Sequence, residues 1–285
     1  MTVSNDNMNV PEIIDFYRVH GLYKSRQDYS DKFKHLEFFN SYTNITIEVI
    51  NKYCSMRSAT GVRNSTINRE ISIMRAAFTF YLKHKPVNFK NVFVGFKLFE
   101  DDFIPRYLDE TDCKRLLYFT KRYENPMLHD FVLLLMNTGC RSSELLKLTW
   151  DNVFLDQNYF VVRNSLSKNS KTVHKPINAD SYLAFRRLRQ MHPNAKYVFY
   201  NPETCTHYRS FRKGFKLAVE RSRIGDLRIH DLRHTFASIL VQRGVPIYEV
   251  STLLGHSDTR ITQRYAHFSP KHLHDAVRVL PSFLG

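Results

Sequence analysis

The stretch that decides the fold reads HDLRHT at residues 230–235, LGH at 254–256 and TQRYAH at 262–267. Apolar side chains follow the first motif at helical steps of three and four, which predicts a helix with His230 and Arg233 on one face. A guanidinium with a fork of donors, two imidazoles (His230 and His256) and the phenol of Tyr265 are the groups that a phosphate site would need. We expect the rest of the chain to complete and deliver that site.

The charge balance is the strongest signal in the composition. The chain has 285 residues, with 42 Lys and Arg against 27 Asp and Glu, which gives a formal net charge of +15. Such an excess favours a polyanion as partner, most often nucleic acid, over a chain that is merely basic and soluble. Binding by charge should weaken steeply with salt, because each neutralised phosphate releases counterions.

The cysteines and the apolar runs indicate the compartment. Cys54, Cys113, Cys140 and Cys205 are far apart in sequence, so no CxxC metal or redox motif is present, and reduced buried thiols are expected. The first residues are polar, and no apolar run approaches a membrane span. The sequence therefore predicts a cytoplasmic or nucleoid-associated protein with no membrane contact.

Changes in periodicity divide the chain into domains. Residues 1–8 are polar and predict a disordered tail, whereas helical spacing runs through 9–86 and predicts a helical domain. Residues 87–106 show no sustained period and are interpreted as an interdomain linker. Residues 107–285 form the second domain, with a C-terminal tail from about residue 270.

The last helix of the first domain is basic. It follows a polar basic loop and is expected to begin at Ser65, with its apolar side chains on one face. Other faces carry side chains that suit a DNA backbone, although a solvated helix face is an equally good interpretation. The candidate DNA-binding residues are Arg63, Asn68, Arg69 and Arg75, together with Lys171 in the second domain.

The second domain predicts a mainly α fold with a small antiparallel sheet. Residues 131–136 are expected to lie in a buried helix that ends at Thr138-Gly139, and another helix opens at Cys140. Residues 158–162 are β-branched and aromatic, 167–171 form a polar turn, and 172–177 read as the return strand. Helices resume near Asp180 and near Arg209.

Two basic residues of this domain are candidates for chemistry. Arg141 follows the Thr-Gly turn at the mouth of a helix, and Glu144 lies three residues later, so the carboxylate could hold the guanidinium; a surface ion pair is the alternative. Lys168 lies at the tip of the hairpin, where a lysine could donate a proton into a closed site or merely be solvated. Lys171 competes for the same role.

Residues 230–234 also allow a different interpretation. The pattern His-x-x-x-His is similar to the zinc motif HExxH with Asp231 in place of Glu, but the shorter acid would reach a metal-bound water poorly. We expect no metal and no cofactor. Tyr265 is one of 16 tyrosines, and its place nine residues after His256 sets it apart.

The motifs together are more specific than any one of them. TGxRxxEL at 138–145, a hairpin lysine, HxxRHTFA at 230–237, LGH at 254–256 and RY at 264–265 occur in that order. This order resembles the tyrosine recombinase (phage integrase) family over about residues 108–270. The resemblance implies a helical core-binding domain followed by an α+β catalytic domain. The catalytic roles that it implies fall on Arg141, Lys168, His230, Arg233, His256 and Tyr265, with Glu144 supporting the first arginine.

The resemblance also implies a reaction and partners. The enzyme would be a site-specific recombinase that cleaves and rejoins double-stranded DNA through a 3′-phosphotyrosine link, without metal or ATP, as the integrase of a phage or other mobile element. A homotetramer on DNA that exchanges C-terminal tails, and accessory DNA-bending proteins, would go with it. An Xer-type resolvase, a relaxing enzyme like type IB topoisomerases, a DNA-binding regulator with a dead site and a zinc hydrolase remain as alternatives.

Overall fold

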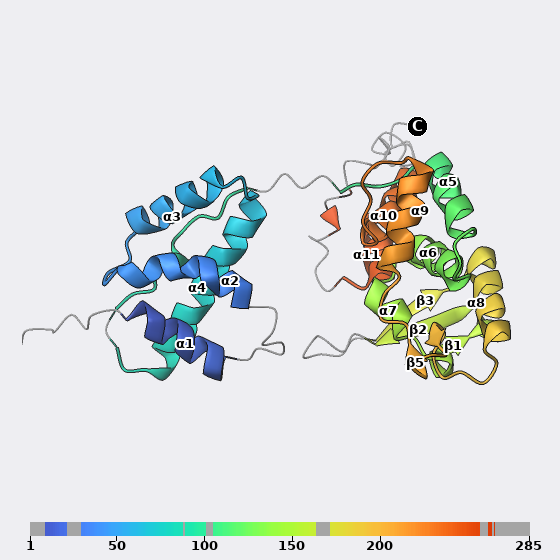
Figure 1. The fold of residues 1–285 in the computed structure, drawn as a ribbon, viewed down its shortest axis with the longest axis horizontal. Helices are drawn as coiled ribbons and strands as arrows, with labels where there is room; N and C mark the ends of the chain where they lie inside the picture. Colours follow the sequence, from blue (N-terminus) through green and yellow to red (C-terminus); the bar gives the residue numbers. More distant parts are fainter. Residues whose placement is uncertain are drawn as a thin grey trace, which may run out of the picture. The chain divides into compact units, whose positions relative to one another are not determined.

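The computed structural model describes residues 9–21, 30–87, 89–100, 105–163, 172–256, 262, 263 and 265. The chain divides into two units, Met1–Phe103 and Ile104–Gly285 (Figure 1). Helices dominate both units, and every strand of the described residues lies in the second one. The mainly α fold with a small antiparallel sheet is therefore confirmed. The expected tails, 1–8 and from about 270, lie outside the described residues.

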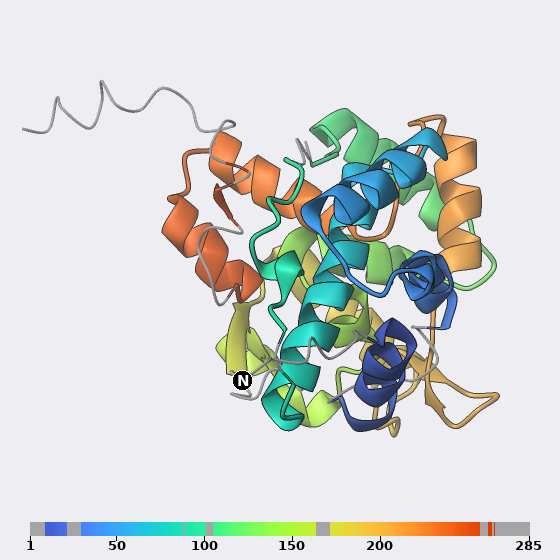
Figure 2. The same ribbon diagram turned by 90° about the vertical axis from the view of Figure 1, so that its left-hand side faces the viewer.

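The described residues of the first unit form four helices and two short 3₁₀ turns. They are α1 (Val10–His20), α2 (Ser30–Leu36), η2 (Glu37–Ser41), α3 (Ile47–Ala59), α4 (Asn64–His84) and η3 (Val92–Val94). Asn9 caps α1 by accepting a hydrogen bond from the backbone N–H of Glu12 at 3.2 Å, and a proline occupies the first turn. Figures 1 and 2 show α1 lying alongside the long α4, on which the apolar faces of the unit converge.

A buried ion pair joins α3 to α4 in this unit. Arg57 donates two hydrogen bonds to the carboxylate of Glu70, at 3.0 and 2.7 Å, and the hydroxyl of Tyr53 donates a third at 2.8 Å. All three side chains are buried, so each charge depends on the other for its compensation. The network fixes the register of the two helices on either side of the loop that carries Arg63.

The segment expected as a linker differs from that expectation over its first part. Phe93 and Phe96 are buried in the core of the first unit, and Phe99 packs against it. Large aromatic side chains are buried when a helix face can cover them. The sequence of this segment has no regular apolar period, so it did not indicate this burial. Residues 89–99 therefore belong to the first unit.

The second unit holds seven helices and two small sheets among its described residues. Its helices are α5 (Glu110–Thr120), α6 (Met127–Thr138), α7 (Ser142–Leu146), α8 (Ala179–Met191), α9 (Arg212–Ser222), α10 (Asp231–Gln242) and α11 (Ile247–Leu254), with 3₁₀ turns η4 (Trp150–Asn152) and η5 (Leu155–Gln157). Asp109 caps α5 by accepting from the backbone N–H of Asp112 at 2.7 Å. Gly139 ends α6 in the left-handed conformation that favours glycine.

The sheet at one end of this unit is antiparallel, with strand order β1–β2–β3. The strands are β1 (Val153–Phe154), β2 (Tyr159–Arg163) and β3 (Thr172–Pro176), and Figure 1 shows them close to α8. Phe160 pairs with Lys175 and Arg163 with Thr172, so the predicted hairpin is confirmed. A short β1 adds an unpredicted third strand, and β4 (Tyr200–Asn201) and β5 (Thr206–His207) form a separate pair.

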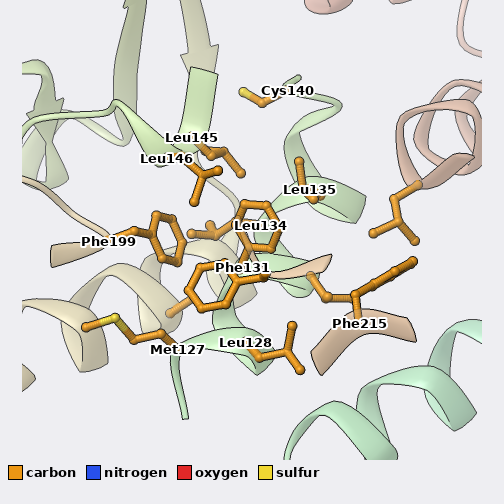
Figure 3. Packing of buried hydrophobic residues seen from close by; sticks show 14 of the residues in the cluster. Met127, Leu128, Phe131, Leu134, Leu135, Cys140, Leu145, Leu146, Phe199 and Phe215 are labelled. Atoms are coloured by element: carbon orange, nitrogen blue, oxygen red, sulfur yellow. The ribbon is translucent and has the colours of Figure 1, made fainter. Parts of the chain in front are cut away.

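Helix α6 forms the centre of the second unit. Its residues Leu128, Phe131 and Leu134 are fully buried, and the ring of Phe131 meets that of Phe199 edge to face at 5.4 Å between centroids (Figure 3). Phe215 of α9 lies in the same cluster. This core places the C-terminal end of α6, and the loop that follows it, against α10 and α11. No helix in the described part of the chain has the length and apolarity that crossing a membrane requires.

Candidate active site

Arg141 is the N-cap residue of α7, and a residue of the same helix, Glu144, orients its side chain. Its backbone N–H donates to one carboxylate oxygen of Glu144 at 2.7 Å, and its guanidinium donates to the other oxygen at 2.7 Å. The carboxylate thus satisfies a free N–H at the helix start and orients the cation with one group. The predicted support of Arg141 by Glu144 is present, and the Arg141 side chain keeps 39% of its surface exposed.

The loop that carries Arg141 is pressed against α10 and α11. A Cβ at Gly139 would lie 2.4 Å from the ring of Phe236 and 2.9 Å from a methyl carbon of Leu254. Only glycine tolerates both this approach and the positive φ of +60° at the end of α6. The close approach brings residues of three separate helices to one place.

Arg233 projects from α10 into this junction. It is buried, and it donates from one terminal nitrogen to the carbonyl of Gly139 at 2.7 Å and from the other to the carbonyl of Leu254 at 2.8 Å. Burial, followed by the positive charge of Arg141, lowers the pKa of Arg233 to about 10. The guanidinium stays protonated at neutral pH, and a bound anion would relieve the repulsion between the two arginines.

His230 lies at the N-terminus of α10 rather than within the helix. It is the N-cap residue, and its carbonyl accepts from the N–H of Arg233 at 3.1 Å. His230 directly precedes the first helical residue, Asp231, and its own backbone angles (φ −68°, ψ −24°) are helical, so its spacing to Arg233 is that of a helix turn. Partial burial, then the charges of Arg233 and also Arg141, lower the pKa of His230 below the ordinary value of 6.5. Its imidazole is therefore neutral at pH 7.

His256 follows the end of α11. Gly255 takes a φ of +67° there and ends the helix, and the backbone N–H of His256 turns back to the carbonyl of Ser251 at 3.1 Å. Nδ1 of His256 lies 2.8 Å from the hydroxyl oxygen of Thr262. That contact orients the ring, and it ties the end of α11 to the segment that carries Tyr265.

Tyr265 is buried, with 2% of its surface exposed, and packs with side chains of α10 and α11. Its hydroxyl lies 2.5 Å from Nδ1 of His234, which is also buried. The rings of His234 and His230 meet edge to face at 5.1 Å between centroids. The phenol also interacts electrostatically with Arg233.

His234 is a site residue whose contact with Tyr265 sequence reasoning missed. Its position four residues after His230 suggested only the zinc alternative. Within the described part of the chain, no group of three or more His, Cys, Asp or Glu side chains is arranged to hold a metal ion. The signal that existed was the period: residues 230 and 234 share a face, and that face meets Tyr265.

The two lysine candidates, Lys168 and Lys171, lie outside the described residues. The strand that follows them carries a third lysine, which the sequence reading did not consider. Lys175 of β3 is buried, and its ammonium donates to the carbonyl of Thr138 at 3.2 Å and to the carbonyl of Leu253. The alternation of β3 was the available signal, because Lys175 occupies a position on the inward face, opposite Phe160.

The candidate DNA-binding residues of the first unit divide into two pairs. Arg63 and Arg69 are exposed and remain candidates. Asn68 instead holds the peptide of Phe99, donating at 2.8 Å and accepting at 2.9 Å, and Arg75 donates to the carbonyls of Phe93 and Phe96. The polar groups of Asn68 and Arg75 thus satisfy the backbone of residues 93–99, and a DNA contact of either residue stays a prediction.

Comparison with known proteins identifies relatives of this chain. The sequence model of the phage integrase family matches residues 106–272. The integrase of Haemophilus phage HP1 is 33% identical over 220 residues, which are 77% of this chain and 60% of that protein. The integrase of Salmonella phage P22 is 29% identical over 192 residues, 63% of this chain and 48% of that protein.

A solved structure gives the same result for the fold. The chain is similar to the Tn1549 transposon integrase in complex with a circular intermediate DNA, with a TM-score of 0.74 at 18% identity, over 95% of this chain and 98% of that chain. This chain spans about half to three-fifths of the length of the two phage relatives above.

Proposed function

Because the chain belongs to the phage integrase family, we propose that it is a site-specific DNA recombinase that cleaves and rejoins strands through a 3′-phosphotyrosine intermediate. One observation carries the proposal: buried Arg233 holds the carbonyls of Gly139 and Leu254, which lie two residues before Arg141 and His256. The next residue of its helix, His234, contacts the hydroxyl of Tyr265. Two guanidinium groups close to one phenol can bind an anion and present it to the phenolic oxygen. A DNA phosphodiester supplies that anion.

The chemistry follows from the groups present. The Tyr265 oxygen forms a bond to phosphorus as the bond from phosphorus to the 5′ oxygen breaks. Arg141 and Arg233 stabilise the charge on the non-bridging oxygens, and His256 adds a donor. His230 assists near the nucleophile as acid, base or donor. The attack of a partner strand's 5′ hydroxyl reverses the step, so the bond energy is retained and ATP is not needed.

Two protons must move in the first step. The phenolic proton has an acceptor within hydrogen-bond distance in Nδ1 of His234, at 2.5 Å. The departing 5′ oxygen gains a proton, for which Lys168 on the hairpin is our candidate and Lys171 the alternative. Two fixed guanidinium groups perform the charge neutralisation that metal ions perform in other phosphoryl transfer enzymes.

The biological role that we propose is that of an integrase of a phage or other mobile element, at the nucleoid. The HP1 and P22 relatives are named integrases, which supports this role over an Xer-type resolvase. A relaxing enzyme like type IB topoisomerases would use the same chemistry. Joining of two distinct duplexes distinguishes recombination from mere relaxation of a supercoil.

The first unit would bind the DNA backbone. Arg63 and Arg69 are exposed next to the start of α4, where a basic loop leads into the helix. Phosphate contacts of this kind position a protein without reading sequence. We propose that these two arginines, and Lys171 of the second unit, are among its phosphate contacts.

Assembly completes the proposal. Four protomers would act on DNA, with tails beyond residue 270 exchanged between neighbours and DNA-bending proteins as possible accessories. The tail sequence has apolar residues at helical steps, at Leu273, Ala276, Val277 and Leu280. A groove of about 370 Å³ between α5, α6 and α10, lined by side chains such as Leu117 and Leu240, offers an apolar surface. Removal of residues 271–285 should then abolish tetramers on DNA, measured by sedimentation.

The experiment that tests the function uses a selected substrate. A duplex that the protein binds is first selected from a pool of random sequences. A set of substrates is then made, each with a nick next to a different phosphate, so that the short strand released by cleavage diffuses away and the covalent intermediate accumulates. A covalent protein–DNA band on a denaturing gel should form with the native chain and vanish with Tyr265→Phe. A band that survives this substitution would show that another residue is the nucleophile.

A further inference from the structure

Lys175 is a lysine whose side chain lies wholly inside the second unit, with 2% of its surface exposed. Its ammonium donates to Thr138, the last carbonyl of α6, and to Leu253, one of the last carbonyls of α11. The final carbonyls of a helix have no partner within the helix and carry the negative end of its dipole. One buried cation thus joins the C-terminal ends of two helices.

Arg233 makes a parallel pair of contacts one residue further along each segment. It donates to the carbonyls of Gly139 and Leu254, which directly follow Thr138 and Leu253. Two cations from different elements, β3 and α10, therefore hold the same two helix ends together. Arg141 and His256 each follow two residues after the carbonyls that Arg233 holds.

Close packing at the same place leaves little freedom for these segments. A Cβ at Gly255 would lie 2.9 Å from a methyl carbon of Val173, two residues before Lys175 on β3. The corresponding atom at Gly139 would lie 2.9 Å from a methyl carbon of Leu254. The strand β3, the end of α6 and the end of α11 are thus in direct contact, with the ammonium at their junction.

The charge of Lys175 is not favoured by its surroundings. Burial lowers its pKa from the ordinary value, and the nearby charges of Arg233 and Arg141 act in the same direction, against the opposing effects of Cys140 and Glu144. An apolar side chain of similar length would avoid this electrostatic conflict. A buried charge that costs free energy of folding and lies next to candidate catalytic residues is typical of a functional site.

We propose that Lys175 is a positioning residue of strand cleavage: it fixes the end of α6 to the end of α11 and so sets the separation of Arg141 and His256 around the DNA phosphate. The inference rests on the proposed function and deepens it. Lys175 acts through backbone carbonyls, and the proton for the 5′ oxygen comes from another group.

The test compares two substitutions with a matched control. Lys175→Met removes the ammonium and keeps the stem, Lys175→Gln keeps a donor without the charge, and Lys216→Met makes the same change at an exposed position of α9. Single-turnover cleavage of the selected nicked duplex is measured at saturating protein, along with DNA affinity and melting temperature. We expect both variants at position 175 to bind DNA within about threefold of the native chain and to cleave roughly 10- to 100-fold more slowly, because small misplacements of catalytic groups have effects of this size.

A second substrate separates positioning from proton donation. Sulfur in place of the bridging 5′ oxygen leaves without a proton, so it rescues the loss of an acid and leaves a misplaced Arg141 uncorrected. We expect the Lys175 variants to remain slow on this substrate, while the Lys216→Met variant cleaves both substrates at the native rate.

Each other outcome would contradict either the positioning role of Lys175 or the proposed function. Rescue by sulfur would make Lys175 the acid and overturn the inference, as would native cleavage rates in the variants. A lower melting temperature with an unchanged rate per bound protein, or loss of folding in both variants, would reduce Lys175 to a structural residue. If the native chain forms no Tyr265-dependent covalent product on either substrate, the proposed function itself fails.

Discussion

The hydroxyl of Tyr265 lies 2.5 Å from Nδ1 of His234, and both side chains are buried. The contact pairs a polar atom of each buried side chain with one of the other. His234 comes from α10, one residue after Arg233, so the same helix contributes a cation and the partner of the phenol. If His234 accepts the phenolic proton of Tyr265, its replacement should lower the rate of cleavage.

Replacement of His234 by alanine should slow cleavage by about 10²- to 10⁴-fold, the usual range for loss of a positioned proton acceptor. DNA affinity should stay the same, because the ring is buried. The measurement is the single-turnover rate of covalent product formation. His129→Ala, at a half-buried histidine of α6 that contacts Thr120 and Leu117, is the control and should cleave normally. A rate within threefold of native for His234→Ala would show that the contact has no part in the reaction.

Arg233→Lys keeps the positive charge and loses the fork of donors. The carbonyls of Gly139 and Leu254 are held by two different nitrogens of the planar guanidinium, and a single ammonium nitrogen cannot reproduce that geometry and also present two parallel donors to a phosphate. We expect a loss of at least about 10²-fold in cleavage rate, comparable to removal of one preorganised donor. Arg221→Lys, at an exposed position in the last turn of α9, serves as the control. Substantial activity in Arg233→Lys would mean that charge alone is sufficient at this position.

Glu144→Gln should loosen Arg141 without removing it. The carboxylate accepts from both the backbone N–H and the guanidinium of Arg141, and the amide can accept only in part. The expected result is a cleavage rate lower by about tenfold with unchanged DNA binding. Asp112→Asn, in the more exposed pair with Arg115, is the matched control and should have no effect on the rate. Equal rates for both variants would contradict the supporting role of Glu144.

The pH dependence of cleavage should report His230. Its pKa is lowered from 6.5 by partial burial and then by the charges of Arg233 and Arg141. If the neutral imidazole assists the reaction, the rate stays level near pH 7 and falls about tenfold per unit only below the lowered pKa. His230→Gln should lose this acid limb of the profile. An unchanged limb in that variant would assign the titration to a different group.

The same shift has a consequence for stability. The unfolded chain binds a proton at His230 near pH 6.5, whereas the folded chain binds it only at lower pH. Stability from this residue is therefore present above pH 6.5 and is lost as the pH falls through the window between the two values. Melting temperatures measured from pH 7 to pH 5 should fall more steeply for the native chain than for His230→Gln.

Two adjacent residues of α4 should respond in opposite ways. Asn68→Ala removes both hydrogen bonds to the peptide of Phe99, so we expect a loss of roughly 1–3 kcal/mol in the free energy of unfolding and little change in salt dependence of DNA binding. Arg69→Ala should keep stability and weaken DNA binding uniformly, with a salt slope lower by about one. Denaturant titrations and affinities at several salt concentrations distinguish the two. An identical pattern in both variants would contradict this division.

The sequence predicted much of the site because its chemistry is local. Glu144 lies three residues after Arg141 and can only meet it at a helix start, so spacing alone indicated the pair. The hairpin of β2 and β3 was likewise predicted from local sequence, because two strand-forming segments flank a polar turn. Residues 89–99 were misread because their aromatic side chains are buried by a helix distant in sequence, a contact that no local period records.

By itself the sequence determined the helices, the hairpin and the set of residue types that a phosphate site requires, since propensity, capping and period act over a few residues. The tertiary structure alone decided that Tyr265 meets His234, that Asn68 and Arg75 serve the backbone, and that Lys175 joins two helix ends. These outcomes depend on which groups remain unsatisfied when distant segments are packed together, and burial makes their satisfaction obligatory.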